Sequence, residues 1–271
     1  MGGQQLGQPF GDEPFEDVPL ASAPLARVLS QLRFDQLGAF ASVTAADEFA
    51  TELADSYPYF ERHSQVNIVL TEGQITPQQA PVPVWRLRSA DKNTTVTLSN
   101  GSLTVETSRY EGRTRFCEEL TRVAAALQKI ARVPNYTRLG IRYTNQISDP
   151  ALLGRLPEFV RPELFSFTQS GTSAVGVQHS LMQVVFSITN DSSLLVQVGD
   201  MPPNSGYDPT LPILPQRSWA LDLDSFCQRE AINPDPVSIA SEANVLGERA
   251  YRYFRWAVTP TFLDAFGGSV D

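Results

Sequence analysis

The first third of the chain switches between the two-residue period of strands and the longer period of helices. Residues 25–34, LARVLSQLRF, place successive side chains on opposite faces and therefore predict a strand. Thr44 followed by Asp47 resembles a capping box, and apolar residues four apart come after it, which predicts a helix over 45–56. We expect a further strand over 65–71.

The middle of the chain carries the clearest local signal, a hairpin centred on Asn100-Gly101. Two runs rich in Thr, Val and Leu, 94–99 and 102–109, flank this pair, and Asn-Gly is typical of a type I′ turn with two positive φ values. A strand over 82–89 precedes the hairpin. The helix that follows it ends before Pro134 and carries an apolar stripe at Phe116, Leu120, Val123, Leu127 and Ile130.

The second half of the chain repeats this order of elements. Periodicity predicts a strand over 138–147, a short helix near 155–160, strands over 176–189, 193–199 and 217–224, a helix over 238–257 and a turn over 259–266. The Pro- and Gly-rich connection 200–216 is too long for a hairpin, so we expect a lid or a binding loop there.

These elements predict an α+β fold made of two tandem units, each a strand, a helix, an antiparallel sheet and a long helix. Residues 21–134 would form the first repeat and 135–271 the second, in a duplicated helix-grip-like arrangement whose sheets would join into one continuous curved sheet. The echo of Leu32-Arg33-Phe34 in Ile141-Arg142-Tyr143 supports duplication and predicts matching environments for the two arginines. One irregular α+β domain is the alternative.

Residues 1–20 differ from the rest because Gly, Gln, Pro and acidic residues dominate and no apolar period is present. Such a segment buries too little surface to offset the entropy of ordering, so we expect a disordered acidic tail. Phe10, Phe15 and Leu20 offer an alternative, a short motif that docks on the folded part.

Composition narrows the location and the kind of partner. The sequence has neither a run of about 18 apolar residues nor a signal-like start, so we expect a cytoplasmic protein without membrane contact. The net charge of −9, without a Lys/Arg run, argues against nucleic-acid binding and favours a basic protein partner. Cys117 and Cys227 lack the CxxC spacing of a zinc site.

Residues able to carry chemistry are few, and none forms a recognisable constellation. His63 and His179 have no carboxylate or histidine at ligand spacing, and the sequence contains no GxSxG or phosphate-binding glycine loop. Asp222 and Asp224 share one face of a predicted strand, which would suit a metal but also the solvent face of a half-buried strand, the interpretation we favour. We therefore predict no catalytic residue, no metal and no cofactor.

Arginines on strand faces are the least expected feature of the sequence. They lie opposite apolar stripes and would form an anion- or protein-recognising patch, or else pair across strands with acids such as Glu106 or Asp222. With two aromatic neighbours they make up our candidate binding residues: Arg33, Arg86, Arg88, Arg138, Arg142, Tyr143 and Trp85.

Three strings in fixed order suggest a family. PLARVLSQLRF at 24–34, RLGIRYTNQI at 138–147 and VTPTFLDAFG at 258–267 resemble a sporadically distributed family of uncharacterised prokaryotic proteins of about this length. The resemblance covers roughly residues 22–267. It implies no activity and no catalytic residues, but a patchy distribution resembles that of defence, immunity and toxin–antitoxin genes.

Three functional hypotheses remain open at this point. The first is a non-enzymatic protein-binding module, an antitoxin- or immunity-like or defence component, in which a homodimer is compatible with the sequence. The second is a small-ligand binder or enzyme with a pocket between sheet and long helices, which convergent polar groups would indicate. The third, nucleic-acid binding by a paired sheet, has only the arginine faces in its favour.

Overall fold

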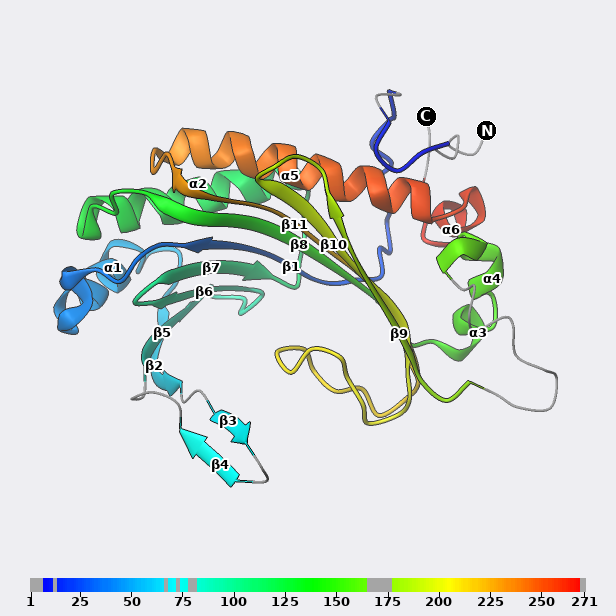
Figure 1. Ribbon diagram of the computed structural model, residues 1–271, viewed down its shortest axis with the longest axis horizontal. Helices are drawn as coiled ribbons and strands as arrows, with labels where there is room; N and C mark the ends of the chain where they lie inside the picture. Colours follow the sequence, from blue (N-terminus) through cyan, green and yellow to red (C-terminus); the bar gives the residue numbers. More distant parts are fainter. Residues whose placement is uncertain are drawn as a thin grey trace. The chain divides into compact units, whose positions relative to one another are not determined.

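The structure, a computed structural model, describes residues 7–11, 14–65, 68–71, 74–77, 82–164 and 177–268 (Figure 1). Its strands are β1 (Leu25–Arg33), β2 (Tyr59–Gln65), β3 (Ile68–Thr71), β4 (Gln74–Pro77), β5 (Val82–Arg88), β6 (Thr94–Ser99), β7 (Ser102–Thr107), β8 (Tyr136–Ile147), β9 (Ser180–Ser187), β10 (Ser192–Met201) and β11 (Ser218–Ile232). Nine of them form one antiparallel sheet in the order β2-β5-β6-β7-β1-β8-β11-β10-β9, and β3 pairs with β4 separately.

Helices complete the α+β class that the sequence predicted. They are α1 (Thr44–Glu52), α2 (Arg113–Ala131), α3 (Pro150–Leu153), α4 (Leu156–Phe159), α5 (Pro236–Ala257) and α6 (Pro260–Ala265), with 3₁₀ turns η1 (Gly38–Ala41) and η2 (Pro162–Leu164). Among the described residues, no helix is both long enough and apolar enough to cross a membrane.

The chain divides into two compact units, each built from segments that are not contiguous in the sequence. Unit 1 contains residues 1–26, 142–225 and 246–271, and unit 2 contains 27–141 and 226–245. The sequence placed a single boundary between 134 and 135, whereas part of the second half, 226–245, belongs to unit 2. Because the divisions fall inside β1, β8, β11 and α5, these four elements contribute residues to both units.

Unit 2 buries one face of its strands together with the apolar stripe of α2. On β5, Trp85 is 1% exposed and Leu87 is fully buried, while Phe116 and Leu120 on α2 are buried as the helical period predicted. Figure 1 shows α2 running along the strands of this unit. Burying a large apolar side chain contributes about 1.5–3 kcal/mol, so this stripe accounts for the helix position better than local propensity does.

Unit 1 has its own core between β10, β11 and the second half of α5. Trp219, Leu221 and Leu223 alternate inward on β11 and lie in one buried cluster with Ala250 and Tyr253 of α5. A group of aromatic rings closes the core where α4 meets α6, with ring centroids 4.5–6.1 Å apart among Phe159, Phe262 and Phe266. The apolar side chains predicted on the strand 217–224 thus pack against the apolar face predicted for the helix 238–257.

The hairpin at Asn100-Gly101 is present, but its turn is not type I′. The register Ser99↔Ser102 leaves a two-residue loop as predicted, yet only Gly101 has positive φ (121°), and Asn100 is absent from the positive-φ residues of the described chain. The Asn100 side chain explains the difference, since Oδ1 accepts a hydrogen bond from Leu37 N at 2.8 Å. This contact holds Asn100 in the ordinary φ region.

Residues 14–20, which we call the docked segment, lie against α5 and α6. Val18 is 5% exposed and its N–H donates to Tyr251 Oη at 2.7 Å, while Arg255 Nη1 donates to the carbonyl of Glu16 at 2.5 Å. Phe15 packs on Tyr251, and Leu20 bridges to Gly268. Of the two predictions for the N-terminal segment, the docked motif describes these residues.

Candidate functional site

The register of unit 2 brings three of the predicted arginines onto one face of its strands. Opposite residues in antiparallel pairs share a face, so the paired residues of neighbouring strands define cross-strand rows. One row runs Glu61, Arg86, Thr97, Thr104, Gln31; a second runs Tyr59, Arg88, Thr95, Glu106, Leu29; a third runs His63, Val84, Ser99, Ser102, Arg33. We call these fifteen residues the arginine face.

The arginine face is mostly polar, with Leu29 and Val84 as its apolar members, and lies opposite the buried core. Trp85 and Leu87 alternate with its residues on β5 and point the other way, into the core. Thr95 and Val84 are 9% and 7% exposed, Tyr59, His63 and Arg33 are exposed, and the other ten residues of the face are half-buried. Hydroxyl, amide and guanidinium groups therefore lie on this face across five strands, β2, β5, β6, β7 and β1.

Charges on this face are only partly compensated. Arg88 Nη2 lies 3.5 Å from Glu61 Oε2, which also contacts His63 Nε2 at 2.9 Å. The hydrogen bond from His63, followed by the charge of Arg88, lowers the pKa of the Glu61 carboxyl. Arg33 Nε donates to Gln31 Oε1 at 2.9 Å. Glu61 thus contacts two basic neighbours, and the second acid of the face, Glu106, lies 4.0 Å from Arg27 Nη1. Its three arginines, Arg33, Arg86 and Arg88, therefore outnumber its two acids.

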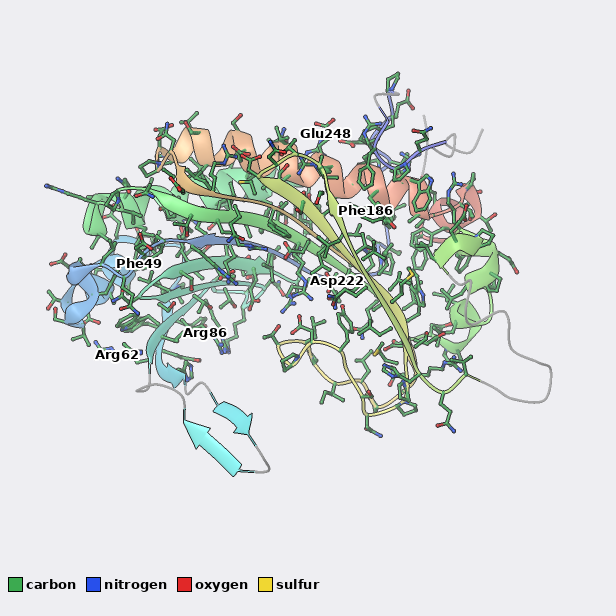
Figure 2. All side chains as sticks on the ribbon, in the orientation of Figure 1. Phe49, Arg62, Arg86, Phe186, Asp222 and Glu248 are labelled. Carbon is green, nitrogen blue, oxygen red and sulfur yellow. The ribbon has the colours of Figure 1, made fainter. Side chains whose placement is uncertain are left out.

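Arg86 is the residue of the arginine face whose hydrogen bonding is least complete. Its Nε is buried and, within the described residues, has no hydrogen-bond acceptor. A buried donor left unpaired costs about 1–3 kcal/mol, so a partner that reorients the Arg86 side chain and accepts a hydrogen bond from Nε would recover that free energy. Figure 2 labels Arg86 on β5 together with Arg62 on β2.

Strand β2 carries an exposed aromatic side chain on each face of the sheet, Tyr59 on the arginine face and Phe60 on the opposite one. Tyr59 and Phe60 are 45% and 38% exposed, and each carries a cation, since Lys92 Nζ lies 5.1 Å from the Tyr59 ring and Arg62 Cζ 5.5 Å from the Phe60 ring. β2 is the terminal strand of the sheet order. Exposed aromatic and arginine side chains on a terminal strand are the residue types enriched in binding hot spots.

Arg142 lies in unit 1, in a cluster with Tyr207, Asp208 and Asp222 that we call the Arg142 cluster. Its Nε and Nη2 contact the two carboxylate oxygens of Asp222 at 2.8 and 2.5 Å, and Nη2 also lies 2.9 Å from Asp208 Oδ2. Tyr207 Oη donates to Asp222 Oδ2 at 2.8 Å. Side-chain exposure is only 2% for Asp222 and 8% for Asp208.

The Arg142 cluster fixes the loop between β10 and β11. Tyr207 and Asp208 come from this loop, whereas Arg142 and Asp222 come from β8 and β11. Burial disfavours the guanidinium cation, but the hydrogen bond and charge of Asp222 outweigh it and raise the pKa of Arg142. Burial and the charge of Asp222 raise the pKa of the Tyr207 hydroxyl. The arrangement is a buried charge network that attaches a loop to a sheet.

Two sequence predictions change here. Asp222 is not on a solvent face, because Tyr207 and Asp208 cover it. The environments of Arg33 and Arg142 do not correspond either: Arg33 is exposed beside Gln31, and Arg142 is enclosed by carboxylates. This pair therefore counts against the duplication. The predicted cross-strand pairing of an arginine with Asp222 is present.

The remaining candidate residues are not members of the three rows that define the arginine face. Trp85 is buried on the opposite side of β5, and Tyr143 is half-buried against the core of unit 1. Arg138 stacks over Phe226 at 4.6 Å, and a Cβ on Gly140 would come within 2.7 Å of its guanidinium, so glycine makes room for it. Sequence reasoning missed Tyr59, Glu61, Tyr207 and Asp208.

Metal-ligand geometry and comparison with known proteins give no further information on the site. Within the part of the chain that the structure describes, no group of three or more His, Cys, Asp or Glu side chains is placed to hold a metal ion. No family model and no curated protein matches the chain. The candidate site accordingly rests on its own geometry.

Proposed function

We propose that the chain is a non-enzymatic protein-binding module that recognises an acidic segment of a partner on the arginine face. The observation that carries this proposal is the buried Nε of Arg86, which has no hydrogen-bond acceptor within the described residues and lies between Glu61 and Thr97 in a row of polar side chains. A carboxylate can accept two hydrogen bonds from one guanidinium, and such bonds are about twice as strong as neutral ones.

Charge refines the kind of partner. The net charge of −9 favours long-range attraction of a basic protein, while the arginine face itself attracts carboxylates. We propose that an acidic segment makes the contact at the arginine face, whatever the charge of the rest of the partner. An antitoxin- or immunity-like role is the form of this proposal that the sequence resemblance suggests.

The decisive experiment compares capture of partners by the full chain and by the Arg86→Ser/Arg88→Ser double variant. Tagged proteins are incubated with native host lysate at low and high salt, and the bound proteins are quantified. We expect one protein enriched by the wild type and reduced at least about tenfold by the variant, because two charge-assisted contacts are lost.

Arg115→Ser is the matched control, since Arg115 lies on α2 and its side chain is 73% exposed. Circular dichroism verifies that all three proteins are folded. Equal capture by the double variant and the wild type would overturn the role of the arginine face. Nucleic acid recovered in place of protein, with a steep salt dependence, would support the nucleic-acid alternative instead.

A further inference from the structure

The outer strand of unit 1, β9, has the composition of a strand that pairs with another strand. Its sequence SLMQVVFS contains no charged residue and no proline, and Leu181 and Val185 are 42% and 56% exposed. β9 ends the sheet order, so within the described residues only β10 pairs with it. Terminal strands are normally protected from pairing by charges, prolines or bulges.

Strand β2, which ends the sheet order in unit 2, has that protection. Glu61, Arg62 and His63 follow one another along it. The contrast indicates that the lack of charge on β9 is a property of this strand and not of terminal strands in this protein.

The hydrogen-bonding pattern of β9 shows which backbone groups remain available. Ile188 N donates to Ser192 O at 2.9 Å, and the register continues Phe186↔Leu194 and Val184↔Val196. Hydrogen-bonded and non-hydrogen-bonded pairs alternate along an antiparallel ladder. The N–H and C=O groups of Leu181, Gln183, Val185 and Ser187 therefore point away from β10, toward the outer edge.

We infer that β9 pairs antiparallel with β9 of a second copy of this chain, with the two-fold axis at Gln183. In that register Gln183 lies opposite Gln183, and Leu181 lies opposite Val185 on both sides of the axis. Every outward backbone group from Leu181 to Val185 then gains a partner. Moving the axis to Val184 shifts the pairing by two residues and places Gln183 against Val185 and Leu181 against Ser187, so it pairs polar with apolar side chains, whereas the axis at Gln183 pairs like with like.

The absence of charge on β9 also suits a second copy in particular. Two copies that each carry −9 repel one another, and a neutral strand brings no additional like charge into the contact. A partner of opposite charge would instead gain from charged residues at the interface. A single strand pair buries little surface, so we expect a dimer that dissociates on dilution.

The test is sedimentation of the full chain over a range of concentrations, with Val185→Lys as the variant. The wild type should show a monomer–dimer equilibrium. Two lysines introduced opposite Leu181 in each dimer should weaken dimerisation by at least about tenfold. Val245→Lys is the control, because Val245 on α5 is 52% exposed and lies outside the strand.

Engineered cysteines test the register. Across a hydrogen-bonded pair the Cα atoms lie about 5.5 Å apart, within the range of a disulfide, so Gln183→Cys should cross-link on mild oxidation. Ser187→Cys should not, because the two copies of residue 187 would lie eight positions apart, about 26 Å. The native Cys117 and Cys227 are buried.

A wild type that sediments as a monomer at all concentrations would overturn the inference. So would a Val185→Lys variant that dimerises as well as the wild type, or cross-linking of Ser187→Cys as readily as Gln183→Cys. Because β9 belongs to unit 1 and the arginine face to unit 2, loss of dimerisation and loss of partner capture are separate results.

Discussion

Arg142 lies between two carboxylates that have little access to solvent. This burial determines how much the Arg142 cluster contributes to the free energy of unfolding. The Arg142 side chain is 20% exposed, Asp208 8% and Asp222 2%. In such surroundings the two charges of a pair depend on each other, because an isolated buried charge is strongly disfavoured.

Asp222→Asn should therefore destabilise the protein by about 3–5 kcal/mol, the usual cost of removing one member of a buried ion pair. The amide cannot accept both guanidinium bonds and also leaves the Tyr207 hydroxyl with a poorer acceptor. Urea unfolding followed by circular dichroism measures the change. Glu158→Gln is the control, since its pair with Arg155 is exposed and worth at most about 1 kcal/mol. Similar losses of unfolding free energy in the two variants would contradict the predicted contribution of Asp222 to stability.

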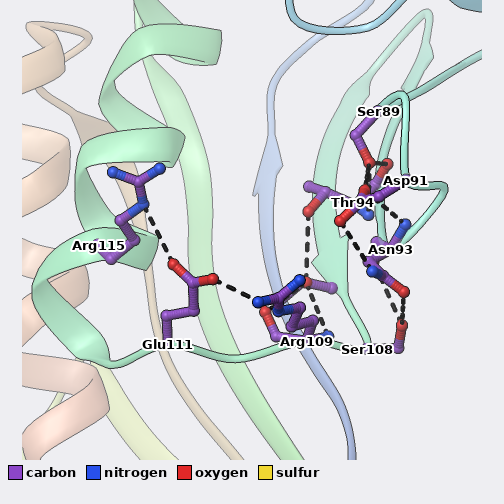
Figure 3. Close-up of polar contacts among 9 residues, drawn as sticks. Ser89, Asp91, Asn93, Thr94, Ser108, Arg109, Glu111 and Arg115 are labelled. Carbon is purple, nitrogen blue, oxygen red and sulfur yellow. Dashed lines mark hydrogen bonds and ion pairs between the residues drawn. The ribbon is translucent and has the colours of Figure 1, made fainter.

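Asp91, in the turn between β5 and β6, gives a pH-dependent prediction at the same scale. Ser89 Oγ donates to Asp91 Oδ1 at 2.6 Å and Asn93 N donates to it at 3.1 Å (Figure 3). The bond from Ser89 contributes most, and together with those from Asn93 it lowers the pKa of Asp91 to about 2. The carboxylate therefore stabilises the fold above the unfolded pKa of about 3.9, and this contribution is lost as the pH falls through about 2.

Carboxyl carbon shifts measured by NMR from neutral to acid pH should show this midpoint for Asp91. Ser89→Ala should move it upward, because the largest contribution is removed. Ser108→Ala should leave it in place, since Ser108 contacts Asn93 and not Asp91. A wild-type midpoint near 3.9 would show that the turn does not hold the carboxylate.

At the scale of elements, the docked segment depends on a few contacts with α5. Tyr251→Phe removes the acceptor of Val18 N–H, whose surroundings exclude water because Val18 is 5% exposed. An unpaired buried donor costs about 1–3 kcal/mol, so the segment should open more often. Hydrogen exchange at Val18 should accelerate about tenfold or more. Tyr59→Phe is the control, because Tyr59 is exposed and its hydroxyl should not affect exchange at Val18. If Tyr251→Phe also leaves the exchange rate at Val18 unchanged, other contacts hold the segment.

Elements with one apolar stripe were predictable from the sequence, and those without one were not. The predicted strand 25–34 is β1, and the stripe from Phe116 to Leu127 is the buried side of α2. β2 was missed because both Tyr59 and Phe60, which point to opposite faces, are largely exposed and break the alternation. Of the predicted strand 65–71, the part at 68–71 is β3, which pairs with β4 outside the large sheet.

The candidate site was predictable only in part, for the same physical reason. Alternation placed Arg86 and Arg88 opposite Trp85, and the register later joined them to Arg33. It did not reveal that a loop covers Asp222, because the contact between Tyr207 and Asp222 is tertiary. A strand pattern gives the two faces of a sheet but not what packs on either face.

For the whole molecule, the secondary-structure elements that the two units share should make unfolding cooperative. β1, β8, β11 and α5 each contribute residues to both units, so neither unit can lose its strands without breaking an element that the other uses. Independent unfolding requires domains joined by few elements. We therefore expect one cooperative transition for the full chain, although its length would accommodate two domains.

Tryptophan fluorescence can report the units separately, because Trp85 lies in unit 2 and Trp219 and Trp256 lie in unit 1. In the Trp85→Phe variant fluorescence reports unit 1, and in the Trp219→Phe/Trp256→Phe variant it reports unit 2. Within each variant, the urea midpoint from fluorescence should equal that from circular dichroism, which follows the whole chain. A circular dichroism transition with a second step that fluorescence does not register would show that one unit unfolds alone. In that case each shared strand would keep its structure only up to the unit boundary in the partly unfolded state. The segments 142–225 and 27–141 would then be separate folding units, although their strands belong to one sheet.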